Sequence, residues 1–166
     1  MVAELLRGWL HLQPRPGSRH MLVSSVLGAE IGAPFGRGRG GPGGWWILDE
    51  PELHLGDDVL VPDLAGWRRE RMPQYPDVPA FTLVPDWVCE VLSPSTRQFD
   101  VTEKRARYLE AGVPHLWFVD PSARTLEVFE ATDAGWLLVS ARRDDEPVAE
   151  VPFDAVEFPL DALWAE

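Results

Sequence analysis

The chain has 166 residues, and its hydrophobic content of 45% and charged content of 25% are ordinary for a globular protein. We therefore expect one domain, residues 1–166, with enough length to bury a core. Its net charge of −12 argues against a general nucleic-acid coat, although the acidic excess is concentrated in residues 121–166 and leaves room for a neutral or basic face elsewhere.

The chain shows none of the patterns of a membrane or secreted protein. No apolar run approaches the roughly 18 residues that a membrane span needs, and residues 1–7 lack the apolar block of a signal peptide. The single cysteine, Cys89, lies within an apolar segment and excludes a disulfide framework. We therefore expect a cytoplasmic protein that does not bind a membrane.

The N-terminal part of the chain predicts a hairpin followed by a helix. Residues 4–12 are typical of two short strands with a turn at Arg7 and Gly8. Ser18 is a suitable N-cap for a helix that ends near residue 31, with His20 in its first turn. The apolar side of this helix is expected to comprise Leu22, Val23, Val26, Leu27 and Ile31.

Residues 35–44 are rich in glycine and predict a flexible loop. They contain the spacing GxGxxG, but no predicted strand precedes it and no helix follows, so a dinucleotide site is excluded. A P-loop is excluded too, because no Lys-Ser or Lys-Thr pair follows the glycines. Arg37 and Arg39 could contact phosphates from this loop, although solvated arginines are the simpler interpretation.

The middle of the chain predicts strands at residues 45–48, 52–55 and 59–67. The third contains Pro62, which indicates a sheet edge or a bulge, and Asp63 follows it. Residues 68–79, with three arginines and three prolines, predict a loop. The eight tryptophans are mostly expected in the core, but one of the neighbours Trp45 and Trp46 should face outward.

Two charged residues interrupt apolar patterns in the next segment. Residues 87–92 are typical of a strand buried on both faces, yet Glu90 lies within them. A helix is predicted over residues 101–111, capped by Asp100 and ended by Gly112, and Lys104 falls on its apolar side. Strands at residues 115–120, 125–130 and 135–141 complete a mixed α/β (α+β) order of elements.

Asp63, Glu90 and Lys104 define the candidate site. Two carboxylates from adjacent strands can hold a hard cation such as Mg²⁺, which acidifies a bound water. A neighbouring lysine can position that water or stabilise charge on a phosphate. The spacing alone fits this chemistry and a buried Glu90–Lys104 ion pair about equally well.

A specific signature favours the first interpretation. It consists of Pro62-Asp63, the run Glu90-Val91-Leu92-Ser93-Pro94-Ser95-Thr96, Asp100, Glu103-Lys104, Tyr108, Ala111-Gly112-Val113-Pro114, Trp117 and Val119-Asp120-Pro121. With these residues the chain resembles the Uma-type restriction endonuclease family of the PD-(D/E)XK nuclease superfamily. The resemblance implies a restriction-endonuclease-like core, a central mixed sheet flanked by helices.

The resemblance also implies residue roles. Asp63 and Glu90 would bind Mg²⁺ or Mn²⁺, together with the backbone carbonyl of Val91. The lysine usual two residues after the acid would be replaced by Lys104 on the helix. Glu4 and His20 would be auxiliary groups around the metal. The implied activity is hydrolysis of DNA by a metal-activated water, leaving a 5′-phosphate. Superfamily relatives that cut both strands often dimerise, so the resemblance also implies a homodimer.

Two other functions remain open from the sequence. One is a catalytically silent nuclease-like module that binds partners, for which the net charge of −12 is the motive. The other is a metal-dependent phosphohydrolase that acts on RNA, nucleotides or branched DNA. A zinc enzyme and a serine hydrolase are disfavoured, since the histidines and the cysteine lack ligand spacing and no Gly-x-Ser-x-Gly motif occurs.

Overall fold

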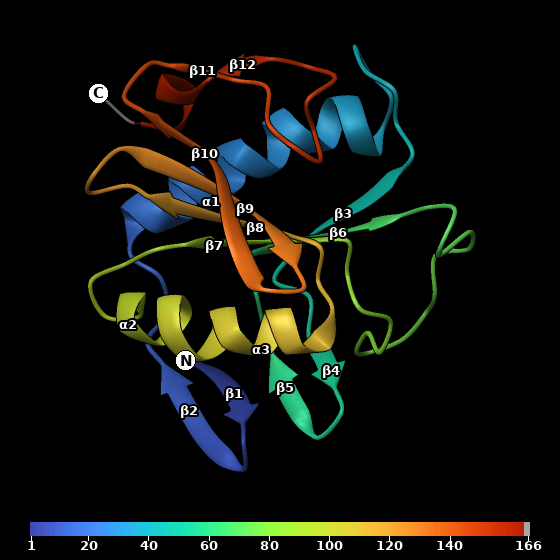
Figure 1. The fold of residues 1–166 in the computed structure, drawn as a ribbon, viewed down its shortest axis with the longest axis vertical. Helices are drawn as coiled ribbons and strands as arrows, with labels where there is room; N and C mark the ends of the chain where they lie inside the picture. The colour runs from blue at the N-terminus through green and yellow to red at the C-terminus, as the bar shows by residue number, and fades with distance from the viewer. Residues whose placement is uncertain (165–166) are drawn as a thin grey trace.

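A computed structural model describes residues 1–164 and builds them around a large mixed β-sheet (Figure 1). Its six strands follow the order β10-β9-β8-β7-β6-β3. They are β3 (Trp45–Asp49), β6 (Leu64–Arg68), β7 (Trp87–Val91), β8 (His115–Asp120), β9 (Thr125–Thr132) and β10 (Gly135–Arg143). β7 and β8 are parallel, whereas the other neighbours are antiparallel. The predicted fold, a central mixed sheet flanked by helices, is confirmed.

A helical crossover joins the two parallel strands, because parallel neighbours cannot be connected by a tight turn. It consists of α2 (Arg97–Phe99), the π-helical stretch η2 (Asp100–Lys104) and α3 (Arg105–Ala111). Gly112 ends the run with a φ of 88°, as predicted. The prediction that Asp100 caps this helix is wrong, since the helical run begins at Arg97 and the Asp100 side chain is buried within it. Lys104, one turn later on the same face, attracts that carboxylate inward.

The two faces of the large sheet are covered by different layers (Figure 1). One face packs against α1 (Ser18–Ile31) and the C-terminal segment with β11 (Pro147–Val148), β12 (Phe158–Pro159) and the 3₁₀ turn η3 (Leu160–Leu163). The other face packs against α3 and a smaller sheet. The C-terminal segment, for which the sequence pattern predicts no element, supplies Phe153, Leu160 and Leu163 to the core.

The helix α1 has a narrower apolar side than its sequence predicts. Val23, Leu27 and Ile31 are buried at intervals of four residues, but Leu22 is 40% exposed. The N-cap position is occupied by Gly17 rather than Ser18, and no side chain caps the helix. The helix is therefore held by its packing on the sheet rather than by its cap.

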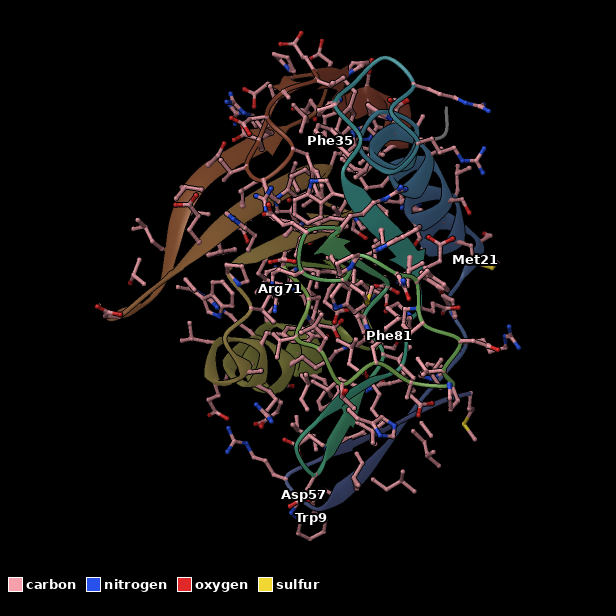
Figure 2. All side chains as sticks on the ribbon, turned by 90° about the vertical axis from the view of Figure 1, so that its right-hand side faces the viewer. Trp9, Met21, Phe35, Asp57, Arg71 and Phe81 are labelled. Atoms are coloured by element: carbon pink, nitrogen blue, oxygen red, sulfur yellow. The ribbon has the colours of Figure 1, made fainter. Side chains whose placement is uncertain are left out.

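The smaller sheet has the order β2-β1-β5-β4 and contains the predicted N-terminal hairpin. Its strands are β1 (Val2–Leu6), β2 (Trp9–Gln13), β4 (Leu53–Leu55) and β5 (Asp58–Leu60). Arg7 and Gly8 form the turn with φ angles of 52° and 80°. Trp9 follows the turn and is 75% exposed, so it does not belong to the core (Figure 2).

The single strand predicted over residues 59–67 is wrong, because the chain changes sheets within it. β5 belongs to the smaller sheet and β6 to the large one. Pro62 lies at the break, where its missing N–H prevents continuous pairing. The bend indicated by Pro62 is thus present, and it places Asp63 between the two sheets.

The glycine-rich segment is folded more closely than the predicted flexible loop. It begins with the π-helical turn η1 (Gly32–Gly36), and the amides of Arg39 and Gly43 then donate to the carbonyls of Ala33 and Pro34 at 2.9 and 2.8 Å. These bonds fold the loop back onto the end of α1. Among residues 1–164, no helix is long and apolar enough to cross a membrane.

Candidate active site

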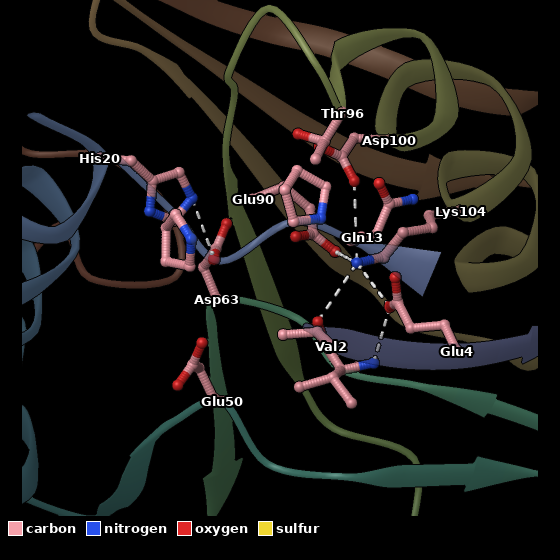
Figure 3. A pocket seen from close by; sticks show the side chains of 13 residues that line it. Val2, Glu4, Gln13, His20, Glu50, Asp63, Glu90, Thr96, Asp100 and Lys104 are labelled. Atoms are coloured by element: carbon pink, nitrogen blue, oxygen red, sulfur yellow. Dashed lines mark hydrogen bonds and ion pairs between the residues drawn. The ribbon is translucent and has the colours of Figure 1, made fainter. Parts of the chain in front are cut away.

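The five residues named as catalytic or auxiliary from the sequence line one cavity of about 50 Å³ (Figure 3). They are Glu4, His20, Asp63, Glu90 and Lys104. The cavity lies where the two sheets meet α1 and the crossover helix. Five segments far apart in the sequence therefore contribute side chains to one place.

The pairing of β6 with β7 explains why Asp63 lies beside Glu90. Leu64 pairs with Cys89, so the next position along this register would bring Asp63 opposite Glu90. Regular pairing stops there, and the Asp63 carboxylate (Oδ2) accepts the backbone N–H of Val91 at 2.7 Å instead. The hydrogen-bonded pairing of β6 with β7 thus ends at the Asp63 carboxylate, which binds the last residue of β7. The Val91 amide contacts Asp63, and a metal-binding role of the Val91 carbonyl stays a prediction.

Lys104 lies among three carboxylates. Its Nζ is 2.7 Å from Glu90, 2.9 Å from Glu4 and 3.7 Å from Asp100. It also donates to the carbonyl of Val61 at 3.2 Å, next to the break between β5 and β6. The helix carries this ammonium inward because Lys104 occupies the sheet-facing side of the crossover, as the apolar spacing predicted.

His20 contacts Asp63 rather than Lys104. Its Nε2 lies 3.1 Å from Asp63 Oδ1, and its Nδ1 is buried without a partner among the described residues. Burial would lower the pKa of His20, but the hydrogen bond and charge of Asp63 raise it above its usual value. The first turn of α1 therefore places an imidazole beside Asp63, whose carboxylate favours the protonated form of the ring (Figure 3).

Three further residues of the site were not assigned to it from the sequence. Tyr108 donates its hydroxyl to Glu90 Oε1 at 2.6 Å, while Asp100 and Glu50 line the cavity. The spacing contained a signal for Tyr108, because it follows Lys104 by four residues and so shares its face. Lys104 carries a second signal: it is the only lysine of the chain.

The cavity is lined by the carboxyl groups of Glu4, Glu50, Asp63, Glu90 and Asp100 and by the basic side chains of His20 and Lys104. Burial raises the pKa of Glu90 well above its usual range, against the opposing effect of Lys104. Burial likewise raises the pKa of Asp100 to about 6. Burial alone would lower the pKa of Lys104, but Glu90, Glu4 and Asp100 raise it, so its amine is protonated at neutral pH. The carboxylates thus outnumber the cations that could neutralise them.

This donor set fits a hard divalent cation. Carboxylate oxygens are the ligands that Mg²⁺ prefers, and Asp63, Glu90 and Glu50 line the cavity together. As arranged, no group of three or more His, Cys, Asp or Glu side chains within residues 1–164 stands close enough to enclose an ion. Ion binding therefore requires side-chain rotations that bring carboxylate oxygens together, including those of Glu90, whose Oε1 contacts both Lys104 and Tyr108.

The sequence matches a known protein-family model over most of its length. The family described as "Uma2: Putative restriction endonuclease" matches residues 2–161. The chain belongs to this family. The resemblance inferred from the sequence is therefore confirmed, and membership supports a nuclease that acts on nucleic acid.

A solved structure shares the fold over almost the whole chain. It is described as a putative nuclease belonging to DUF820 from Anabaena variabilis ATCC 29413, and it superimposes with a TM-score of 0.80. The two sequences are 24% identical over 98% of this chain and 89% of that chain. No curated protein matches the sequence significantly.

Proposed function

We propose that this member of the Uma2 family is an endodeoxyribonuclease that depends on Mg²⁺ or Mn²⁺ and acts as one nuclease domain. The observation that carries the proposal is the convergence of Asp63, Glu90 and Lys104 in one acidic cavity. Restriction-endonuclease-like families generally use divalent metals. The family description, a putative restriction endonuclease, supports DNA as the substrate class.

In this proposal Asp63 and Glu90 hold the ion, assisted by the Val91 carbonyl. A bound divalent ion supplies an acidified water and neutralises charge on the scissile phosphate. Lys104, as an ammonium, orients that water and stabilises the charge that develops on the phosphate. Tyr108 fixes Glu90 through their hydrogen bond, and Glu4 fixes Lys104.

His20 has a positioning role in this scheme. Its contact with Asp63 Oδ1 fixes the orientation of that carboxylate. Glu50 and Asp100 add negative charge around the cavity and so favour occupation by a cation.

The experiment is cleavage of supercoiled and linear DNA by purified protein in Mg²⁺, Mn²⁺ or EDTA. We expect Asp63→Asn, Glu90→Gln and Lys104→Ala each to lower the rate by a factor of about 10² or more. Lys104→Arg should restore little, because a guanidinium differs in shape from an ammonium. Asp57→Asn, in an exposed turn, removes one acid elsewhere and is the control.

Metal-dependent cleavage that all three variants retain at the wild-type rate would contradict the proposal. Parallel reactions with RNA and with branched DNA test the neighbouring assignment, a phosphohydrolase of another substrate class. A preference for either over linear DNA would correct the substrate and keep the site.

The second candidate function is a catalytically silent module in which Lys104 only neutralises its neighbours. Its specific support is that Lys104 already contacts three carboxylates. Thermal melts separate the two functions. A metal site predicts a higher melting temperature in Mg²⁺ that Asp63→Asn abolishes, whereas a silent ion-pair cluster predicts no effect of Mg²⁺.

We also propose that the protein is cytoplasmic and forms a homodimer. The support for a dimer is β2, an edge strand whose Trp9, Leu10 and Leu12 are 75%, 65% and 55% exposed. Light scattering should give the mass of two chains at micromolar concentration, and Trp9→Ser with Leu10→Ser should give the mass of one. A wild-type mass of one chain would contradict the dimer.

A further inference from the structure

The glycine-rich loop and the large cavity beneath it have no role in the site described above. This cavity of about 600 Å³ is lined by α1, η1, β3 and the loop side chains Arg37 and Arg39. Both arginines are exposed, and no carboxylate pairs with either among the described ion pairs. Arg69 lies on the cavity wall as well.

Arg69 holds the loop in place rather than presenting a free charge. Its guanidinium lies 4.0 Å from the centre of the Trp46 ring, and it donates to the carbonyls of Trp45 at 3.1 Å and Gly36 at 2.7 Å. Gly41 packs so closely on Pro34 that a Cβ there would lie 2.4 Å from the proline Cβ. The loop is thus built to hold Arg37 and Arg39 over the cavity.

The arginine cavity and the acidic site both adjoin a third cavity. This intermediate cavity of about 330 Å³ shares Ser25 and Asp49 with the arginine cavity, and it shares His20, Glu50 and Asp63 with the site. The three cavities lie along α1, which runs from Met21 toward the loop that follows Phe35 (Figure 2). At 1.5 Å per residue, the path from His20 to the end of η1 at Gly36 measures about 24 Å.

We infer that this groove binds the phosphate backbone of one substrate DNA strand, with the scissile phosphate at the acidic site and Arg37 and Arg39 on phosphates farther along. The inference rests on the proposed nuclease function and adds its substrate-binding residues. Since successive nucleotides of a duplex strand rise about 3.4 Å along the helix axis, the arginines lie about seven nucleotides from the reacting phosphate. The middle of the groove is lined by the carboxylates of Asp49 and Glu50 and by the guanidinium of Arg15, so phosphate contacts there are less favourable than those to Arg37 and Arg39.

The test measures binding of fluorescent single-stranded DNA of about 15 and about four nucleotides, in Ca²⁺ to prevent turnover. We expect Arg37→Ala/Arg39→Ala to bind the longer strand about tenfold more weakly, since two charge-assisted contacts are lost. The slope of log affinity against log salt should fall by about 1.4, or about 0.7 for each phosphate. Binding of the short strand, which does not reach the loop, should not change.

The matched control is Arg19→Ala/Arg143→Ala, which removes the same charge from exposed positions. Arg19 lies on α1 but lines a separate cavity, and Arg143 lies on β10. The groove would be overturned if the two double variants lost equal affinity for the longer strand. It would also be overturned if Arg37→Ala/Arg39→Ala lost as much affinity for the short strand as for the longer one. Circular dichroism checks that both variants are folded.

Failure of the groove and failure of the proposed function are distinguishable. If the wild-type protein cleaves DNA in a metal-dependent way and Arg37→Ala/Arg39→Ala binds DNA as tightly as the wild type, the groove alone is overturned. Binding that depends on strand length and on these arginines, with no cleavage in any metal, overturns the nuclease activity and keeps the groove.

Discussion

Cys89 and Glu90 are neighbours on β7, yet they face opposite sides of the large sheet. The side of Cys89 also contains Trp87 and Val91 and is packed with apolar residues from α1 and the C-terminal segment. The side of Glu90 contains Val88 and Leu92, but here the apolar core is interrupted by buried charges from three segments. Strand alternation separates the two environments within one residue.

The two faces differ in how their buried groups stabilise the fold when no ligand is bound. On the first, Phe153 contacts Trp45, Trp87 and Trp117 with ring centres 4.8, 4.9 and 5.7 Å apart. Such packing stabilises the fold whatever the solution contains. On the second, Glu90 and Lys104 stabilise each other only as a pair, because a buried charge that loses its partner is strongly unfavourable. We therefore expect the proposed metal binding to change the stability of the charged face and to leave the apolar face unaffected.

The largest loss of stability should come from the apolar face. Phe153→Ala removes the ring at the centre of the aromatic cluster, and we expect it to lower the free energy of unfolding by about 3–5 kcal/mol. Urea denaturation measures this loss, which should be the same in Mg²⁺ and in EDTA. A loss that depends on Mg²⁺ would show that the two faces are not independent.

Lys104→Met tests the charged face with an effect of similar size. It leaves Glu4, Glu90 and Asp100 without their cation, so in EDTA we expect a loss of about 3–5 kcal/mol. Glu90→Gln should cost less, because Lys104 keeps its contact with Glu4. Equal losses in the two variants would contradict the central place of Lys104. In contrast to Phe153→Ala, added Mg²⁺ should recover part of the loss, since the freed carboxylates gain a new cation.

Metal binding itself should stabilise the wild-type protein by an intermediate amount. At a Mg²⁺ concentration about 100 times the dissociation constant, the free energy of unfolding should rise by about 2.7 kcal/mol. Asp63→Asn should abolish this gain. Cys89→Ala, on the other face of β7, should keep it. A gain that persists in Asp63→Asn would place the ion elsewhere.

The smallest effect should come from the hydrogen bond between Tyr108 and Glu90. Tyr108→Phe removes the hydroxyl that donates to Glu90 Oε1 at 2.6 Å and should lower the free energy of unfolding by about 1–3 kcal/mol. If Tyr108 also orients Glu90 for the metal, the variant should bind Mg²⁺ more weakly in calorimetry. Tyr75→Phe, at a residue 51% exposed, is the control and should change neither quantity.

The sequence predicted the elements whose signals are local. The hairpin at Arg7 and Gly8, the helix end at Gly112 and the inward direction of Lys104 each follow from turn chemistry or spacing, and the structure contains all three. The predictions that failed depended on partners elsewhere in the chain. Asp100 has the residue type of a cap, but Lys104 attracts it into the cavity, and Leu22 has the residue type of a core position, but the sheet covers only the Val23 side of α1.

The sequence by itself determined the types of group in the site: two acids, a buried lysine and the family signature around them. Only the tertiary structure decided their geometry. Pro62 moves the chain from one sheet to the other, the β6–β7 register then ends at Asp63, and the crossover brings Lys104 and Tyr108 over Glu90. Such contacts join residues far apart along the chain, and their distances depend on strand register and helix position, which no local pattern specifies.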